Sequence, residues 1–230
     1  MSEEHTPAEL VNELINIPSE WKNDVLDAIS QTALEYAKNS VIRVGYGRGF
    51  LAQTVDSPVI ITCAHCLPHM PPAIGSVMSP HERTYFRLVG ALGAEPTITV
   101  ECLFVDPVAD VAVLGEPNGQ LYDEAEAYCA FVEERQGLAI AAEQNAALPG
   151  VQSRGAWLTL EGEWVHHSLE VGVRCVCTSE KTAARGMSGS PIILDTVRRT
   201  TVVGVVASGD VHPRLVTALP AWLLRKLVLR

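Results

Sequence analysis

Residues 59–68 read VIITCAHCLP. Four β-branched residues, VIIT, come first, and a histidine between two cysteines follows them. Short runs of this kind recur from Val41 onward, rich in Val, Ile and Thr and separated by Gly, Pro and Asp. β-Branched residues favour strands, and short strands at regular spacing are typical of antiparallel barrels and sandwiches. The sequence therefore predicts an all-β body that begins near residue 41.

Helical segments are predicted on either side of this body. Residues 7–39 carry apolar side chains at helical spacing, interrupted at Pro18. Residues 1–40 contain eight acidic and two basic residues. The last segment, 220–230, has the pattern of an amphipathic helix, and it is basic. Such a helix can bind a membrane surface.

The composition argues against several classes of protein. The 230 residues are 47% hydrophobic and 19% charged, which is enough apolar material for a folded core. The formal net charge of −10 argues against a nucleic-acid partner, because phosphates would be repelled. No run reaches the roughly 18–20 apolar residues that span a bilayer, and the acidic start differs from a signal peptide. We expect a cytoplasmic protein without a membrane partner, whose six cysteines are reduced.

Three segments carry side chains suited to nucleophilic catalysis. His65 follows a strand-like run, Asp110 opens another in VADVAVL, and Ser188 lies between glycines in RGMSGSP. A serine hydroxyl needs a base to take its proton, and histidine, with a pKa near ~6.5, suits that role. A carboxylate can hold the imidazole in the required tautomer. Gly186 and Gly189 permit a sharp turn whose backbone N–H groups face a substrate carbonyl.

These segments resemble those of trypsin-like serine peptidases, which have the chymotrypsin fold. TCAHC resembles their T-A-A-H-C, DVAVL their D-I-A-L-L and GMSGSP their G-D/N-S-G-G/S-P. GRGFLA and VVGVVASG resemble two further strands, G-S-G-F-L and G-I-V-S-W-G, and all five segments follow the order of the family. DPVADVAVL is closest to the bacterial HtrA-like type. The resemblance covers residues 41–219 and implies two antiparallel six-stranded β-barrels.

The predicted organisation follows from this resemblance. Residues 117–135 have the composition of an acidic, turn-rich connector between the barrels. Few residues follow the second barrel, so we expect no PDZ domain of the HtrA kind. The four predicted parts are an acidic helical extension over 1–40, a first barrel with His65 and Asp110 over 41–118, a second barrel with Ser188 over 119–219, and a C-terminal helix packed on the second barrel over 220–230.

The resemblance implies a serine endopeptidase that acts on proteins or peptides without a cofactor or metal. Ser188 would attack the peptide carbonyl, His65 would relay the proton to the leaving amine, and Asp110 would orient His65. The backbone N–H groups of Gly186 and Ser188 would hold the oxyanion. No acidic residue stands at the expected base of the specificity pocket, so the resemblance does not imply a preference for Lys or Arg. By position, the substrate-binding residues would be Thr182 at the pocket base and Ala207, Ser208 and Gly209 along its wall.

The chain departs from the family at two positions. Met187 stands where zymogen-type relatives carry an aspartate that binds a newly cleaved N-terminus. Activation by such a cleavage is therefore not expected, and residues 7–39 are predicted to recruit a regulatory protein partner. The strand GRGFLAQ lacks the cysteine that would bridge Cys66 in secreted relatives, in keeping with reduced thiols.

Three alternatives remain at the level of the sequence. The chain could keep the fold as a catalytically silent module that binds partners, or it could be an esterase-type acyl hydrolase with the same triad. CAHCLPH could also hold a metal through Cys63, His65, Cys66 and His69, although no second Cys/His pair stands at the usual zinc spacing.

Overall fold

The computed structural model describes residues 34–54, 57–72, 81–118, 120–135, 137–140, 152–171, 175–178, 185–194, 201–208 and 215–220. Residues 34–38 are helical, and Leu34 and Ala37 within them are buried. The rest of the predicted helical extension and the predicted C-terminal helix lie outside the described residues. Among the described residues, no helix has the length and hydropathy needed to cross a bilayer.

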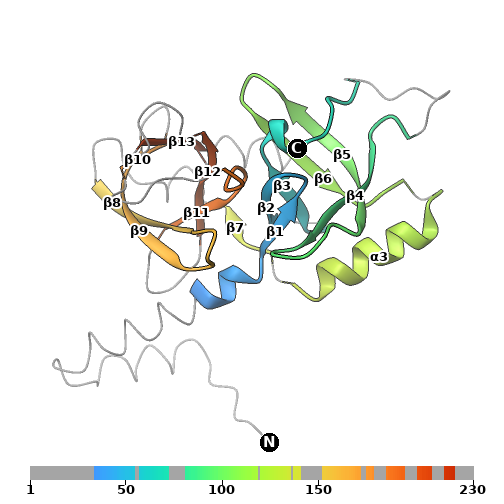
Figure 1. Ribbon diagram of the computed structural model, residues 1–230, viewed down its shortest axis with the longest axis horizontal. Helices are drawn as coiled ribbons and strands as arrows, with labels where there is room; N and C mark the ends of the chain where they lie inside the picture. The colour runs from blue at the N-terminus through green and yellow to red at the C-terminus, as the bar shows by residue number, and fades with distance from the viewer. Residues whose placement is uncertain are drawn as a thin grey trace, which may run out of the picture.

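The first half of the described chain forms a closed barrel of six antiparallel strands (Figure 1). Its strands in chain order are β1 (Val41–Val44), β2 (Gly47–Ala52), β3 (Val59–Thr62), β4 (Thr84–Ala91), β5 (Ile98–Asp106) and β6 (Val111–Gly115). The order around the barrel is β1-β2-β3-β6-β5-β4, and the pairing of β1 with β4 closes it. All residues of β2, β3 and β6 are buried, which explains why these strands are almost continuously apolar.

The second half forms a seven-stranded sheet, on the left in Figure 1. Its strands are β7 (Ala139–Ile140), β8 (Gln152–Leu158), β9 (Trp164–Val171), β10 (Cys175–Thr178), β11 (Pro191–Leu194), β12 (Thr201–Ser208) and β13 (Leu215–Pro220). The order is β11-β8-β9-β10-β13-β12-β7, with an additional pairing of β11 and β12. The predicted mostly β architecture is confirmed, whereas the six-stranded second body is not, because β7 adds a seventh strand parallel to β12.

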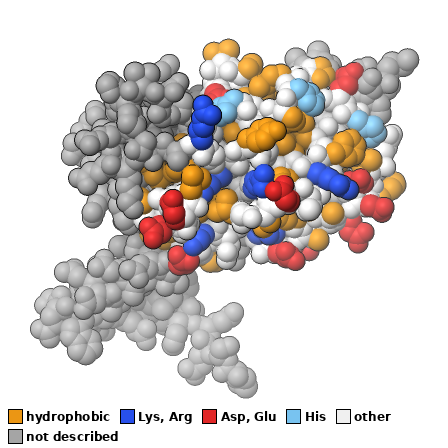
Figure 2. Space-filling view, in the orientation of Figure 1, with side chains coloured by type: hydrophobic (Ala, Val, Ile, Leu, Met, Phe, Trp, Pro, Cys, Tyr) orange, Lys and Arg blue, Asp and Glu red, His pale blue; other side chains and the backbone are white. Residues whose placement is uncertain are grey.

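The predicted turn-rich connector is wrong, because a helix, α3 (Tyr122–Glu133), occupies most of it. Its buried residues recur at helical spacing, while most of its acidic residues are exposed. The buried members are Ala125, Tyr128, Phe131 and Val132. The helix packs against β5, and Figure 2 shows acidic side chains gathered at the lower right, where α3 lies. The acidic composition thus reflects one face of a helix rather than a solvated loop.

A short segment after α3 joins the barrel to the second sheet. The backbone of Leu138 exchanges hydrogen bonds with β2, donating to the Leu51 carbonyl at 2.8 Å and accepting from the Gln53 N–H at 2.9 Å. The next two residues form β7, which pairs with β12 and lies between the two bodies in Figure 1. The hydrophobic core is likewise shared, since Val202 and Val205 of β12 belong to the cluster that fills the barrel.

Candidate active site

His65 is presented by a single 3₁₀ turn, η1 (Ala64–Cys66), which follows β3. Cys63 begins the turn, and the Cys66 N–H closes it by donating to the Cys63 carbonyl oxygen at 3.1 Å. Ala64 and Cys66 are buried, whereas the His65 side chain is half exposed. The turn is therefore anchored in the core by its flanking residues and holds the imidazole at the surface.

Asp110 stands at the entrance to β6 in a left-handed backbone conformation, with φ of +55°. A short polar side chain tolerates this region better than most non-glycine residues. The preceding turn is held by Asp106, whose Oδ1 accepts from the N–H groups of Val108 and Ala109 at 2.9 Å each. This turn directs the Asp110 carboxylate toward His65.

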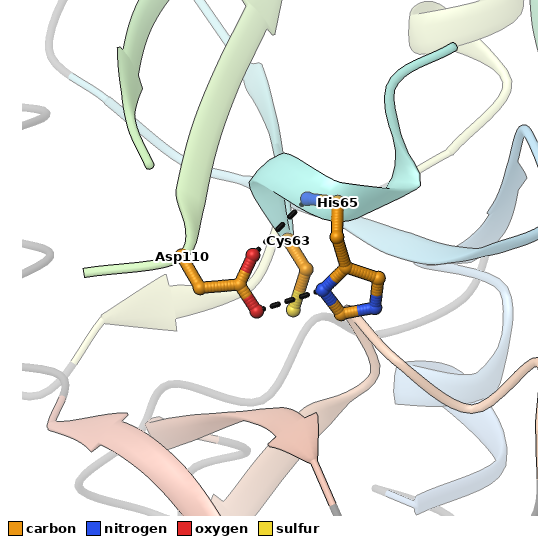
Figure 3. Close-up of side chains that lie close together, drawn as sticks. All are labelled: Cys63, His65 and Asp110. Carbon is orange, nitrogen blue, oxygen red and sulfur yellow. Dashed lines mark hydrogen bonds and ion pairs between the residues drawn. The ribbon is translucent and has the colours of Figure 1, made fainter. Parts of the chain in front are cut away.

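Both oxygens of the Asp110 carboxylate hold His65 (Figure 3). Oδ2 lies 2.8 Å from the ring Nδ1, and Oδ1 accepts the backbone N–H of His65 at 3.0 Å. An ionised carboxylate only accepts hydrogen bonds, so Nδ1 is the protonated nitrogen in this contact. In the neutral ring, Nε2 then keeps its lone pair, which is the state that a general base requires.

Ser188 lies in a tight turn over residues 186–190 that leads into β11. The turn has left-handed conformations at Gly186, with φ of +91°, and at Gly189, with φ of +87°. A Cβ at Gly189 would also lie only 1.9 Å from the Arg48 carbonyl oxygen. Both the backbone conformation and the available space therefore require glycine at position 189.

Backbone hydrogen bonds hold the Ser188 turn against both halves of the molecule. The Arg48 N–H of β2 donates to the Ser188 carbonyl at 2.7 Å, and the Gly189 N–H donates to the Val206 carbonyl of β12 at 2.7 Å. The Ser188 hydroxyl donates to the Ala207 carbonyl at 3.5 Å. The hydrogen bonds among the described residues include none between Ser188 and His65. In the structure, His65 is therefore hydrogen-bonded to Asp110, whereas the Ser188 hydroxyl is hydrogen-bonded to a backbone carbonyl of β12.

The predicted oxyanion donors, Gly186 and Ser188, belong to this same turn. Met187 between them is 2% exposed, so it anchors the turn by packing. Gly186 also lines an open cavity of about 490 Å³, together with Tyr46 and Leu160. The surface beside the turn therefore has a depression next to Gly186.

The predicted substrate-binding residues divide into two groups. Ala207 is in β12 and lies next to Ser188 through its carbonyl oxygen. Ser208 ends the same strand, where the register with β13 shifts. Thr182 and Gly209 lie outside the described residues. The structure therefore places β12 beside Ser188. The role of Thr182 at the base of the pocket stays a prediction.

Arg48 is a residue of the site that the sequence analysis missed. Only 3% of it is exposed, and its guanidinium donates to the carbonyls of Leu158 at 2.6 Å and Thr159 at 2.8 Å, where β8 ends. A longer contact of 3.5 Å reaches the Ser190 hydroxyl. Burial lowers the pKa of Arg48, while the charge of Glu161 opposes this shift. The sequence signal that could have indicated this role is the arginine in GRGFLA. The strand G-S-G-F-L, which GRGFLA resembles, has a serine at that position.

Cys63, His65 and Asp110 each present one atom that could bind a metal, and these atoms lie within 4.8 Å of one another (Figure 3). Hydrogen bonds already use all three. The His65 Nδ1 is bonded to Asp110, and the Cys63 thiol donates to the Val206 carbonyl at 3.2 Å. We interpret the group as a hydrogen-bonded cluster rather than a metal site.

Among the described residues, the structure does not bring Cys66 and His69 together with Cys63 and His65 as a group of metal ligands. His69 turns away to pack against the ring of Tyr85, with ring centroids 4.9 Å apart. Cys66 instead contacts Gly47, where an added Cβ would lie 2.5 Å from its sulfur. Within the described residues, the cysteines at 63, 66, 102 and 129 are free thiols.

Comparison with known proteins identifies the fold. No protein-family model matches the chain, and no curated protein matches its sequence. Among solved structures, the Rv3671c protease from M. tuberculosis in an inactive form is 18% identical, with a TM-score of 0.54 over 87% of this chain and 94% of that chain. The serine protease domain of the Sesbania mosaic virus polyprotein is 13% identical, with a TM-score of 0.53 over 84% and 93%.

A serine endoprotease from Yersinia pestis is also similar, with 14% identity and a TM-score of 0.53 over 86% of this chain and 64% of that chain. These neighbours are serine proteases with the chymotrypsin-like fold, and the protein shares that fold. The comparison does not single out the HtrA-like type. At these identities the likeness concerns the fold alone.

Proposed function

We propose that the protein is a serine endopeptidase in which Ser188 is the nucleophile, His65 the general base and Asp110 the residue that orients His65. The observation that carries this proposal is the two-point contact of the Asp110 carboxylate with His65, at 2.8 and 3.0 Å. A single contact could be a surface ion pair. Here the contact of Oδ2 with Nδ1 favours the tautomer with a protonated Nδ1, and the contact of Oδ1 with the backbone N–H fixes the carboxylate relative to the turn that carries the ring. The fold shared with serine proteases supports the same assignment.

In this mechanism the Ser188 hydroxyl first leaves the Ala207 carbonyl and turns to Nε2 of His65. Catalytic hydrogen bonds often tighten only when substrate is bound. His65 takes the proton as Ser188 attacks the peptide carbonyl, and it then protonates the leaving amine. The N–H groups of Gly186 and Ser188 stabilise the oxyanion, a contribution worth about 10²–10³-fold per donor.

Substrate binding and domain organisation complete the proposal. The strand with Ala207 and Ser208 would pair with an extended peptide, with Gly209 and Thr182 forming the rest of the pocket.

We also propose that the second sheet is the second barrel of the fold. β11 pairs with β8 at one end of the strand order and also with β12 near the other end. The pairings that run from β11 through β8, β9, β10 and β13 to β12 therefore close on β11. Residues 7–39 would recruit a regulatory partner in the cytoplasm of a bacterium.

A silent module is the second candidate, because the Ser188 hydroxyl contacts Ala207 rather than His65. Cleavage of a peptide library by the purified protein and by Ser188→Ala separates the candidates, with Ser57→Ala as a control at an exposed serine. The endopeptidase proposal expects cleavage that is lost in Ser188→Ala and kept in Ser57→Ala. Hydrolysis of esters without any peptide cleavage would indicate an acyl hydrolase, and no turnover of either would indicate the silent module.

A further inference from the structure

Two cysteines enclose His65 in the same turn. Cys63 begins η1 and Cys66 ends it, and the hydrogen bond from the Cys66 N–H to the Cys63 carbonyl, at 3.1 Å, closes the turn between them. Turns of this length bring their end Cα atoms within about 7 Å, and a disulfide needs about 4.4–6.8 Å. The two thiols are also close enough to affect each other's ionisation. The length of the turn is therefore compatible with a disulfide between its two ends.

The two thiols differ in acidity, which suits them to react in sequence. When Cys66 ionises, the Cys63 S–H can turn from the Val206 carbonyl to the Cys66 sulfur. This interaction lowers the pKa of Cys66 to about 7, against the opposing effect of burial, and Thr62 and the charge of His65 act in the same direction. The same contact and burial raise the pKa of Cys63 well above its ordinary value. Near neutral pH the pair thus holds one thiolate that attacks and one thiol that follows. Burial raises the pKa of Cys102, so that thiol is less reactive.

The same two thiols connect the turn of His65 to the segments around Ser188. The Cys63 thiol donates to the Val206 carbonyl at 3.2 Å, and the Cys66 thiol donates to the Ser188 carbonyl at 3.6 Å. These carbonyls also accept the N–H groups that hold the Ser188 turn in place, those of Gly189 and Arg48. Any reaction that removes both thiol protons would remove both links across the site.

We propose that Cys63 and Cys66 are a reversible oxidation site, whose disulfide switches off the Ser188 centre. The effect on activity rests on the proposed endopeptidase function, whereas formation of the disulfide does not. With a peroxide as the oxidant, the Cys66 thiolate attacks one peroxide oxygen, breaks the O–O bond and becomes a sulfenic acid. The hydroxide that leaves takes up the proton that Cys66 lost on ionisation and becomes water. The Cys63 thiol then attacks that sulfur and releases a second water. Two electrons and two protons pass from the thiols to the peroxide, and a dithiol reductant reverses the change.

The disulfide would act on both partners of the proposed chemistry. It draws the ends of η1 together, because its sulfurs lie about 2.05 Å apart, and His65 is inside the ring that it closes. It also removes the two S–H donors on the Val206 and Ser188 carbonyls. A misplacement of about 1 Å can cost about 10²-fold in rate, so we expect the oxidised protein to react at Ser188 at least about tenfold more slowly.

The chemical part of the proposal is tested on the full chain treated with hydrogen peroxide, followed by alkylation and peptide mass spectrometry. We expect a mass loss of two hydrogen atoms within the peptide that contains both Cys63 and Cys66, and full recovery after dithiothreitol. The Cys129→Ala variant should behave identically, because Cys129 is exposed on α3. Alkylatable Cys63 and Cys66 at peroxide concentrations that oxidise Cys129 would overturn the proposal.

The regulatory part is tested by the rate at which a fluorophosphonate labels Ser188 before oxidation, after oxidation and after reduction. We expect a reversible fall in the wild type, and only a slow irreversible fall in Cys63→Ala, each compared with its own untreated rate. An equal reversible fall in Cys63→Ala, or a disulfide that leaves labelling unchanged, would refute the switch. If the reduced protein is never labelled, the endopeptidase proposal fails, while the mass measurement still decides the disulfide.

Discussion

At the scale of single residues, the contact between His65 and Asp110 defines the site. One carboxylate serves both the ring and the backbone of the histidine, so ring orientation and turn position are set by the same side chain. The left-handed backbone of Asp110 aims that carboxylate. A chemical change at one carboxylate oxygen is therefore expected to alter the histidine tautomer with little change of shape.

Asp110→Asn tests this reasoning. The amide keeps the size of the side chain but offers a donor to the ring, so Nδ1 becomes the acceptor and Nε2 carries the proton. The expected loss in kcat is about 10⁴-fold, with the midpoint of thermal unfolding little changed. Peptide cleavage and calorimetry measure the two quantities. A variant that cleaves within tenfold of the wild type would show that Asp110 does not set the tautomer.

Cys66 gives a pH-dependent prediction at the same scale. Because its pKa is lowered to about 7, the thiolate forms as pH rises through 7, and alkylation by iodoacetamide should accelerate over the same interval. In Cys63→Ala the main stabilising hydrogen bond is lost, so the midpoint should move up toward the ordinary value of about 8.5. Mass spectrometry of the Cys66 peptide follows both rates. An unchanged midpoint in Cys63→Ala would contradict the stated cause.

At the scale of elements, the Ser188 turn is fitted against the backbone of β2. Gly189→Ala would combine a left-handed backbone with a Cβ only 1.9 Å from the Arg48 carbonyl. We expect a loss of about 2–4 kcal/mol in the free energy of unfolding. Gly93→Ala is the matched control, because its φ is +82° but nothing lies within 4 Å of the added Cβ.

The control variant should lose only the backbone contribution, about 1–2 kcal/mol. Urea denaturation of both variants gives the difference that belongs to the close approach. Equal losses in the two variants would mean that the turn can move away from β2, and that its position relative to His65 is not fixed by packing.

At the scale of the whole molecule, the two bodies are joined by a shared core, by the segment 137–140 and by the buried guanidinium of Arg48. The guanidinium belongs to β2 of the barrel but satisfies two carbonyls at the end of β8. Its loss would remove one donor from each carbonyl. The Thr159 carbonyl would keep the N–H of Gly162 at 3.1 Å, whereas a buried carbonyl left without any donor costs about 1–3 kcal/mol. The site between the bodies therefore depends on a contact made away from the proposed catalytic groups.

Arg48→Met is expected to lower the free energy of unfolding by about 2–4 kcal/mol. Arg43→Met is the control, because the Arg43 guanidinium is only partly buried. It pairs with the exposed Glu95 at 3.3 Å and donates to the Gly45 and Ala94 carbonyls near solvent, so its loss should cost less, about 1 kcal/mol. Guanidinium denaturation measures both, and fluorophosphonate labelling reports whether the Ser188 turn shifts. A loss in Arg48→Met no larger than that of the control would show that this arginine does not hold the halves together.

The parts of the fold that the sequence predicts correctly depend on local patterns. The barrel strands VIIT and VAVLG are predictable because short apolar runs rich in Val and Ile favour strands. α3 is mispredicted because its acidic residues dominate the composition, although its buried residues keep helical spacing. The order of His65, Asp110 and Ser188 is visible in the sequence, but their distances are not. The roles of Arg48 and of the Cys63–Cys66 pair depend on contacts between segments far apart in the chain.

The most direct test of the central claim is the site and rate of fluorophosphonate labelling of the reduced full-length protein. The account predicts a single labelled residue, Ser188, with labelling abolished in Ser188→Ala and reduced at least about 10³-fold in His65→Ala. Label on another residue, or equal labelling of the wild type and Ser188→Ala, would contradict the claim that His65 and Asp110 activate Ser188.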